Sequence, residues 1–163
     1  MQAVKIDNLG EWIKKAGESQ RVSEFQYPFA STFFVNIAYA SKFLLGQIRE
    51  ASKEISMNLR THQSEDHINE NKMRDEYARV IIKGWRGLTI KALYLLVPGL
   101  DVVMEKETAG TIGDEVEIPY DPAIASIIMK NSLDFETWII DIAVNSANFS
   151  KIAESKKAQI ENL

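Results

Sequence analysis

Residues 78–89, which read ARVIIKGWRGLT, constrain the fold more than any other segment, because they place two glycines and a tryptophan directly after an apolar pattern. The apolar positions before the glycines recur at helical spacing, at Met73, Tyr77, Val80 and Ile81. A helix is therefore expected to end here, and Gly84 suits the left-handed residue that commonly closes a helix. Trp85 and Leu88 are then expected to fold the departing chain back over that helix.

The chain before this segment shows two different apolar periods. Phe25 and Tyr27 alternate with polar residues, and residues 31–39 are rich in aromatic and β-branched side chains, so residues 23–39 predict a small β-hairpin. From about residue 40 the apolar residues recur in steps of three and four, at Leu44, Ile48, Ala51, Ile55 and Leu59. This spacing predicts one helix over residues 40–59.

Two polar stretches flank these elements. Residues 1–22 contain a short helical pattern that Gly10 and Gly17 weaken, so we expect a loose N-terminal segment there. Residues 61–72 are polar and charged, which indicates an exposed loop or the start of a protruding helix.

The second half of the chain reads as helices separated by a loop. Residues 90–103 are strongly apolar with a break at a Pro-Gly pair, and residues 105–117 are acidic with two glycines, which indicates a loop. The Asp-Pro pair at residues 121–122 is a helix start, because Asp accepts bonds from the first free amides and Pro needs no amide hydrogen there. A second helix start is expected at Ser132 or Asp134.

These patterns predict a mainly α-helical domain over residues 23–149 with a small N-terminal β-hairpin or strand element, and an α+β fold is the alternative. Residues 1–22 precede the domain, and residues 150–163 form a polar C-terminal tail. The chain has 163 residues, of which 45% are hydrophobic, and is therefore long enough to bury one core.

Charge and composition exclude several classes of partner. The formal net charge is -4, so the attraction to nucleic acid that relies on Lys and Arg is not expected. The longest apolar runs fall short of the roughly 20 residues that cross a bilayer, and the N-terminus lacks the apolar stretch of a secretory signal. There is no cysteine, which removes disulfides and suits a reducing cytoplasm. We therefore expect neither a nucleic-acid partner nor a membrane partner.

Three clusters could carry chemistry, and each has a simpler explanation. His62 and His67 lie near acidic residues, but their spacing is not that of a zinc site and the region is polar. The GWRG sequence at residues 84–87 resembles the GXXG loop of KH domains, but its tryptophan and the acidic chain favour a helix end instead. The carboxylates between Glu105 and Glu117 lack the spacing of an EF-hand and favour a solubilising loop. We expect no catalytic residue, no metal site and no cofactor.

The aromatic residues are candidates for core positions and for partner contacts. Most of them are expected in the core, where large apolar side chains stabilise a fold most. Phe33 and Phe34 are adjacent, so in a strand they point to opposite faces, and one stays exposed unless another layer covers it. This pair therefore indicates a candidate interaction surface.

Four motifs follow one another in the second half of the chain: AxxIIKGWRGLT at residues 78–89, EIPYDPA at residues 117–123, Phe135 with Trp138 and Ile139, and Asn148 with Phe149. In this order they resemble the tail assembly chaperones of long-tailed bacteriophages. The GWxGLT turn and the IPY helix start are the most specific elements. The resemblance covers about the last half of the chain, and the strand-then-helix layout of residues 25–59 adds a weaker similarity.

The resemblance implies a small, mainly helical, non-enzymatic protein of the host cell cytoplasm. Such a protein binds the tape-measure protein, keeps its hydrophobic helices soluble and promotes tail-tube assembly, with the tail-tube protein as a further candidate partner. Docking of a client helix in an apolar groove is the natural mode of binding. Together with the phenylalanine pair, the candidate partner-binding or structural residues are Phe33, Phe34, Trp85, Leu88, Tyr120 and Trp138.

Two other classes of function stay open. A structural virion or tail-completion protein would use Phe33, Phe34 and residues 93–96 in a permanent oligomer interface, and stable oligomers are commonly symmetric. A homo-oligomer is therefore an alternative to a monomer. A small enzyme or toxin that acts on a host target would need a polar catalytic cluster, which the sequence does not display.

Overall fold

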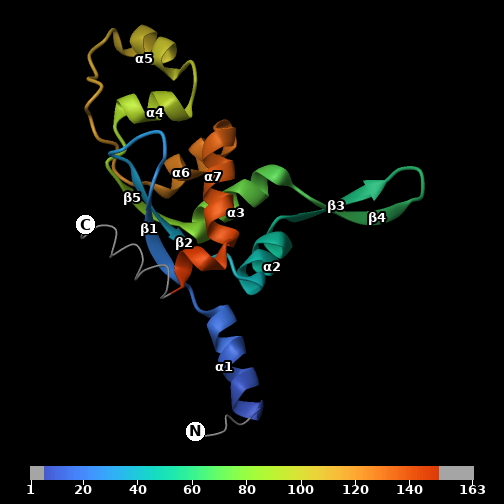
Figure 1. Cartoon of the computed structure of the whole chain (residues 1–163). Helices are drawn as coiled ribbons and strands as arrows, with labels where there is room; N and C mark the ends of the chain where they lie inside the picture. The colour runs from blue at the N-terminus through green and yellow to red at the C-terminus, as the bar shows by residue number, and fades with distance from the viewer. Residues whose placement is uncertain (1–5, 151–163) are drawn as a thin grey trace, which may run out of the picture.

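The chain folds into an α+β structure with two separate antiparallel sheets (Figure 1). The computed structural model describes residues 6–150. The helices are α1 (Ile6–Glu18), α2 (Lys42–Ala51), α3 (Glu70–Ile81), α4 (Ile90–Leu96), α5 (Leu100–Thr108), α6 (Pro122–Asn131) and α7 (Leu133–Val144), followed by the 3-10 turn η1 (Ser146–Phe149). The strands are β1 (Val22–Gln26), β2 (Phe34–Ala38), β3 (Lys53–Asn58), β4 (Gln63–Ile68) and β5 (Ile82–Arg86).

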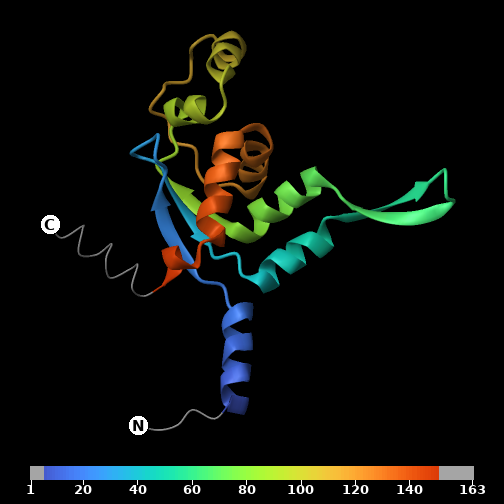
Figure 2. The ribbon, with the colours of Figure 1, turned by 45° about the vertical axis from the view of Figure 1, so that its right-hand side comes forward.

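The larger sheet has three strands in the order β1-β2-β5, and both pairings are antiparallel. Burial of the side chains alternates along the middle strand, β2. Val35 and Ile37 are fully buried on one face, and Phe34 and Asn36 are half-buried on the other. Helices α3 and α7 contact β2, and α6 packs against both of these helices (Figure 2). The helices therefore cover the face of the sheet that carries the buried residues.

The core lies between this sheet and four helices. Each helix contributes a side chain that is almost completely buried: Ile48 of α2, Ile81 of α3, Met129 of α6 and Ile139 of α7. Burial of such aliphatic side chains is the main stabilising contribution in a domain of this size.

The second sheet is a two-stranded hairpin of β3 and β4 that projects from the body (Figures 1 and 2). Its register runs without interruption from the base to the turn. At the base, the amide of Asn69 donates a hydrogen bond to the carbonyl oxygen of Ser52 at 2.9 Å. We refer to residues 53–68 as the hairpin arm.

The prediction of a mainly α-helical domain is wrong, because the helix predicted over residues 40–59 stops early. Helix α2 ends at Ala51, where the hydroxyl of Ser52 donates a hydrogen bond to the carbonyl oxygen of Ile48 at 2.6 Å. The chain then enters β3 and returns through β4. Of the exposed loop or helix start predicted for residues 61–72, residues 63–68 are a strand instead, and residues 70–72 are the start of α3.

The end of α3 also differs from the predicted glycine cap. Helix α3 ends at Ile81, and β5 begins at the next residue. Gly84 lies inside β5 opposite Asn36, and a Cβ at this position would stand 3.3 Å from the side-chain nitrogen of Asn36. Glycine here makes room for a neighbouring strand. The left-handed glycine of the motif is Gly87, with a φ of 70°.

Several local predictions are confirmed. The hairpin predicted over residues 23–39 is present as β1 and β2, although it belongs to a three-stranded sheet. Asp121 caps α6, where its carboxylate accepts a hydrogen bond from the amide of Ala123 at 2.7 Å. Ser132 caps α7, where its hydroxyl accepts a hydrogen bond from the amide of Phe135 at 3.3 Å.

The predictions for the segments before and after the domain have different outcomes. The N-terminal segment expected to be loose contains the regular helix α1. The polar tail predicted at residues 150–163 lies outside the described residues, apart from Ser150. Between these ends, α4 and α5 are separated by the predicted Pro-Gly break, and the acidic stretch expected as a loop begins inside α5.

Candidate functional site

The two most specific motifs of the chain lie against each other. The indole nitrogen of Trp85 donates a hydrogen bond to the carbonyl oxygen of Ile118 at 2.9 Å, and the hydroxyl of Tyr120 donates one to the carbonyl oxygen of Ile82 at 3.0 Å. The rings of Trp85 and Tyr120 meet edge to face, with their centroids 5.0 Å apart. Burial, together with the carboxylate of Asp121, raises the pKa of Tyr120 and keeps its hydroxyl a donor. The two motifs therefore hold each other in place.

The glycine turn of the motif touches the connection between β1 and β2. A Cβ on Gly87 would overlap the backbone carbonyl group of Thr32, so only glycine fits at this crossing. The hydroxyl of Thr32 donates a hydrogen bond to the carbonyl oxygen of Gly87 at 3.1 Å. The amide of Gly87 donates one to the carboxylate of Glu117 at 2.8 Å, and the neighbouring Leu88 is fully buried.

The predicted aromatic residues form one connected cluster in the core. Phe33 is fully buried, with its ring centroid 6.2 Å from that of Trp85 and 6.1 Å from that of Phe135. Trp138 packs against Phe135 at 6.2 Å and meets Tyr27 edge to face at 5.0 Å. Aromatic pairs in these arrangements stabilise a core beyond their buried area. These side chains therefore support the fold from within.

Phe34 faces the opposite side of the sheet from Phe33, in agreement with the alternation expected for adjacent strand residues. The guanidinium of Arg86 lies 4.0 Å from the centroid of the Phe34 ring. Arg86 also donates two hydrogen bonds to the carboxylate of Glu24, at 2.8 and 3.0 Å, and these bonds raise its pKa. Phe34 is therefore partly covered by a side chain of its own sheet.

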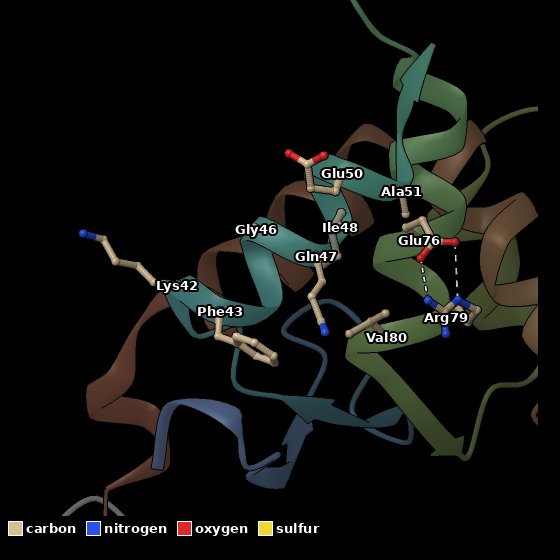
Figure 3. Close-up of a pocket in the computed structure, with 10 residues that line it drawn as sticks. All are labelled: Lys42, Phe43, Gly46, Gln47, Ile48, Glu50, Ala51, Glu76, Arg79 and Val80. Atoms are coloured by element: carbon tan, nitrogen blue, oxygen red, sulfur yellow. Dashed lines mark hydrogen bonds and ion pairs between the residues drawn. The ribbon is translucent and has the colours of Figure 1, made fainter. Parts of the chain in front are cut away.

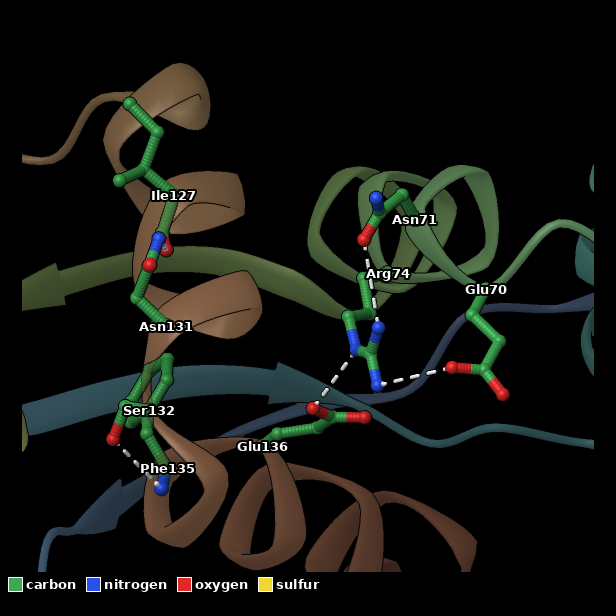
Figure 4. Close-up of polar contacts among 8 residues, drawn as sticks. All are labelled: Glu70, Asn71, Arg74, Ile127, Asn131, Ser132, Phe135 and Glu136. Atoms are coloured by element: carbon green, nitrogen blue, oxygen red, sulfur yellow. Dashed lines mark hydrogen bonds and ion pairs between the residues drawn. The ribbon is translucent and has the colours of Figure 1, made fainter.

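Polar side chains connect α3 to α7. Arg74 of α3 donates a hydrogen bond to the carboxylate of Glu136 in α7 at 3.1 Å (Figure 4). The same guanidinium lies 3.7 Å from the carboxylate of Glu70 and donates to the side-chain oxygen of Asn71 at 3.5 Å. Arg74 and Glu136 are 62 residues apart in the sequence, so their interaction joins two distant parts of the chain.

A second polar contact connects α3 to α6. The carboxylate of Asp75 lies 2.6 Å from the ammonium group of Lys130 and accepts a hydrogen bond from the hydroxyl of Ser126. The bonds from Lys130 and Ser126 lower the pKa of Asp75. These charged groups therefore serve to hold helices together.

Among the described residues, the hairpin arm carries the most exposed apolar row. Ile55, Met57 and Leu59 are 75%, 66% and 83% exposed, and they alternate with polar residues along β3 and into the turn. Ile55 and Met57 therefore share one face of the arm. Their cross-strand neighbours are Asp66 and Ser64, which do not cover them. An apolar row on a projecting arm indicates a contact surface for another molecule.

The other face of the arm is polar and bonded within the chain. The carboxylate of Glu54 lies 2.8 Å from the ammonium group of Lys72 and 3.6 Å from the imidazole of His67. The bonds from Lys72 and Asn69 lower the pKa of Glu54. Near the turn, the side-chain amide of Asn58 donates a hydrogen bond to the carboxylate of Glu65 at 2.8 Å. These contacts brace the arm on the side opposite to the apolar row.

The sequence contains a signal for the arm that the prediction missed. Residues 55–59 read ISMNL, which is a strict alternation of apolar and polar residues and therefore a strand pattern. The four-residue step from Ile55 to Leu59 fits both a helix and a strand. Met57 decides between them, because it would leave the apolar face of the predicted helix.

A shallow groove lies between α2 and α3. It has a volume of about 660 Å³ and includes Phe43, Gly46, Gln47, Ala51 and Val80 in its lining (Figure 3). Phe43 and Gln47 extend from α2 on the side that faces Val80 (Figure 3). At its edge, Glu76 and Arg79 of α3 pair with each other at 2.6 Å. We call this surface the α2–α3 groove.

Two classes of site are not found in residues 6–150. Within this range no helix has the length and apolar character to span a membrane. The same range contains no group of three or more His, Asp or Glu side chains placed to bind a metal ion.

Comparison with known proteins places the chain in a family. The family model described as YdaY prophage protein matches residues 39–162, a range that includes the hairpin arm, the α2–α3 groove and both motifs. No curated protein and no solved structure matches the chain. The family match covers more than half of the sequence, so the chain is of phage origin and belongs to the YdaY prophage protein family.

Proposed function

We propose that this prophage protein is a non-enzymatic tail assembly chaperone that acts in the host cytoplasm. In this role it binds the tape-measure protein of the same prophage and promotes assembly of the tail tube around it. The phage origin of the chain and the motif resemblance of its second half support the proposal. The observation that carries it is the apolar row of Ile55, Met57 and Leu59 on the projecting hairpin arm.

The arm has the features of a contact surface rather than of a core element. Within residues 6–150, β3 and β4 pair only with each other, so both outer edges of the arm are free of strand partners. A two-stranded hairpin with no further layer is marginally stable in water. A partner that covers the apolar row stabilises the arm, because apolar surface then leaves water.

The dimensions of the row suit a helical client. From Ile55 to Leu59 the chain spans at most about 13 Å, at about 3.3 Å per residue, because β3 ends at Asn58 and Leu59 begins the turn. Two and a half turns of an α-helix span about the same length, at about 5.4 Å per turn. The three apolar side chains therefore match one apolar stripe of an amphipathic helix, the form in which a tape-measure protein presents its hydrophobic residues.

The ionisable groups between the helices support a non-enzymatic role. Arg74 pairs with Glu136, and Asp75 pairs with Lys130, so these charges hold α3 against its neighbours. Side chains that are engaged in such pairs serve packing, whereas a catalytic centre needs groups poised to exchange protons with a substrate.

The proposal is tested by co-expression of the chain with the tape-measure protein, followed by affinity capture and mass spectrometry of purified virions. A soluble complex and absence of the chain from virions are expected. The triple variant Ile55→Ser, Met57→Ser, Leu59→Ser should lose the complex, whereas the matched variant Ser56→Ala, Gln63→Ala on the polar face should keep it. Retention of the complex by the triple variant would remove the arm as the client surface.

The alternative function is a structural virion or tail-completion protein. Stoichiometric presence of the chain in purified virions would establish it. Of the interface predicted for it, Phe33 and Leu96 are buried in the core of the same chain, whereas Leu95 is 56% exposed. A permanent interface would therefore use Leu95 and other exposed apolar side chains.

A further inference from the structure

Helix α1 carries an apolar stripe that the rest of the described residues, up to residue 150, leave exposed. Leu9, Trp12, Ile13 and Ala16 are all exposed, with Trp12 and Ile13 at 53% and 65%. Their spacing of three and four residues places them on one side of the helix. Lys14 and the other charged residues from 11 to 18 occupy the opposite side.

The stripe needs a partner for physical reasons. An isolated helix of 13 residues is marginal in water even with favourable residues, and the two glycines of α1 weaken it further. In amphipathic helices of this length most of the stabilisation comes from packing of the apolar face. Packing of the stripe on another surface would therefore stabilise α1.

Within the described residues, the contacts of α1 with the body are at its C-terminal end. The hydroxyl of Ser41 donates a hydrogen bond to the carbonyl oxygen of Gly17 at 2.8 Å and accepts one from the amide of Leu44 at 3.2 Å. Ser41 thus fixes the end of α1 to the start of α2. From this point α1 runs away from the body, so that its other end projects away from the sheet (Figures 1 and 2).

The α2–α3 groove offers a matching surface. Phe43 is exposed at one end of it, and Gly46 forms a notch because nothing lies within 4 Å of where its Cβ would stand. Val80 of α3 and Ala51 of α2 continue the apolar lining (Figure 3). A notch at a glycine lets the backbone or a large side chain of another helix approach closely.

We propose that two copies of the chain exchange their α1 helices, so that the stripe of each copy seats in the α2–α3 groove of the other. Stable soluble oligomers are most commonly two-fold symmetric, and in such a dimer every contact occurs twice. A seated helix of about 20 Å supplies on the order of half of the roughly 1,600 Å² that a stable interface buries, so two reciprocal contacts reach that size.

The charges on α1 favour a protein surface over a membrane. Helix α1 carries Asp7, Glu11 and Glu18 against Lys14 and Lys15, so its formal net charge is -1. Helices that lie on anionic lipid carry a polar face rich in Lys and Arg. The edge of the groove is mixed in charge, with the pair of Glu76 and Arg79. The helix therefore suits the mixed charge of the groove better than an anionic lipid surface.

The test uses sedimentation velocity of the whole chain over a range of concentrations. The wild-type chain is expected to form a dimer, and the stripe variant Ile13→Asp and the groove variant Gly46→Glu are expected to be monomers. Both positions are exposed and outside the core, so neither variant should unfold the core. The matched control Lys14→Ser should dimerise like the wild type, and Gly46→Ala, which adds only a methyl group, should weaken the dimer less than Gly46→Glu does.

Mixing the two variants makes the test specific for exchange. In a mixture, the intact α1 of the Gly46→Glu chain can still seat in the intact groove of the Ile13→Asp chain, so one of the two contacts is restored. Partial recovery of a weaker dimer is therefore expected at the highest concentration, and a mixture that sediments there like the separate variants would overturn the exchange. A dimer that survives Gly46→Glu unchanged would mean that the α1 helices pair with each other. A wild-type chain that stays monomeric at the highest concentration would overturn the proposal. None of these outcomes bears on binding of the tape-measure protein.

Discussion

Trp85 and Tyr120 meet edge to face with their ring planes at 90°, and this contact joins β5 to the segment that leads into α6. Each side chain also donates a hydrogen bond to the backbone of the other segment. Two motifs that are about thirty residues apart in the sequence are thereby held in one unit. The conspicuous residues of both motifs face the interior, so their first role is to stabilise the fold.

Replacement of Trp85 by alanine is expected to lower the free energy of unfolding by about 3–5 kcal/mol, the usual cost of truncating a large buried aromatic side chain. Trp85 is almost completely buried and would leave a cavity beside Phe33 and Tyr120. Urea denaturation measures the change. The Trp85→Phe variant retains a ring but loses the hydrogen bond to Ile118, so its loss should be smaller. An unchanged urea midpoint for Trp85→Ala would contradict the structural role.

Replacement of Gly87 by alanine should lower the free energy of unfolding by more than the cost of backbone strain alone. A left-handed conformation costs a residue with a side chain about 1–2 kcal/mol. At position 87 the new Cβ would also overlap the carbonyl group of Thr32. Gly110 is a matched control, because its φ of 72° is close to the 70° of Gly87 and nothing lies within 4 Å of its Cβ position. Gly110→Ala should therefore cost clearly less in thermal denaturation, and equal losses would refute the steric clash.

Ile37 and Ile55 form a matched pair of isoleucines in two different sheets. Ile37 is fully buried in β2, so Ile37→Ala should cost about 2–5 kcal/mol. Ile55 is exposed on the hairpin arm, so Ile55→Ala should change the free energy of unfolding by less than about 0.5 kcal/mol. Urea denaturation of both variants checks this difference. A large loss for Ile55→Ala would mean that the arm is covered in the isolated chain.

The contact between Asp75 and Lys130 predicts a specific acid dependence of stability. The pKa of Asp75 is lowered in the folded state below its ordinary value of 3.8. Its ionised form therefore stabilises the fold at neutral pH, and this contribution is lost as the pH falls through the lowered pKa. The Asp75→Asn variant should be less stable than the wild type above about pH 5, and the difference should shrink as the pH falls below 3.8.

Urea denaturation of wild type and Asp75→Asn at a series of pH values from neutral to acid checks this dependence. Lys130→Ala removes the partner instead of the carboxylate, and it should reduce the effect of the Asp75→Asn replacement. A difference between wild type and Asp75→Asn that does not vary with pH would show that Asp75 acts through packing alone.

Local sequence signals were sufficient to predict where a helix begins when its first residues are bonded by a side chain close by in the sequence. Asp121 and Ser132 begin α6 and α7 because each side chain bonds an amide two or three residues further along. The hairpin of β1 and β2 could also be predicted. Its two strands show the apolar and polar alternation of a strand, and only a short connection separates them in the sequence. The aromatic residues expected in the core are there because their large apolar surface is costly to leave in water.

The role of residues 82–86 depended on a distant partner. Residues 82–86 read IKGWR, and this segment resembles a helix end when only its neighbours in the sequence are considered. In the fold it becomes β5, because β2 offers it a row of backbone hydrogen bonds and the helices cover one face of the sheet. Strand pairing of this kind joins residues nearly fifty positions apart, and local propensity cannot report it.

The surfaces that carry both proposals were likewise decided by tertiary structure. Composition and spacing determine that Leu9, Trp12, Ile55 and Leu59 are apolar and regularly placed, but the same spacing describes a side chain that is buried. Only the packing of the remaining chain leaves them exposed, because the core is already filled by the three-stranded sheet and the helices α2, α3, α6 and α7. Burial is a property of the whole fold, whereas periodicity is a property of a few neighbouring residues.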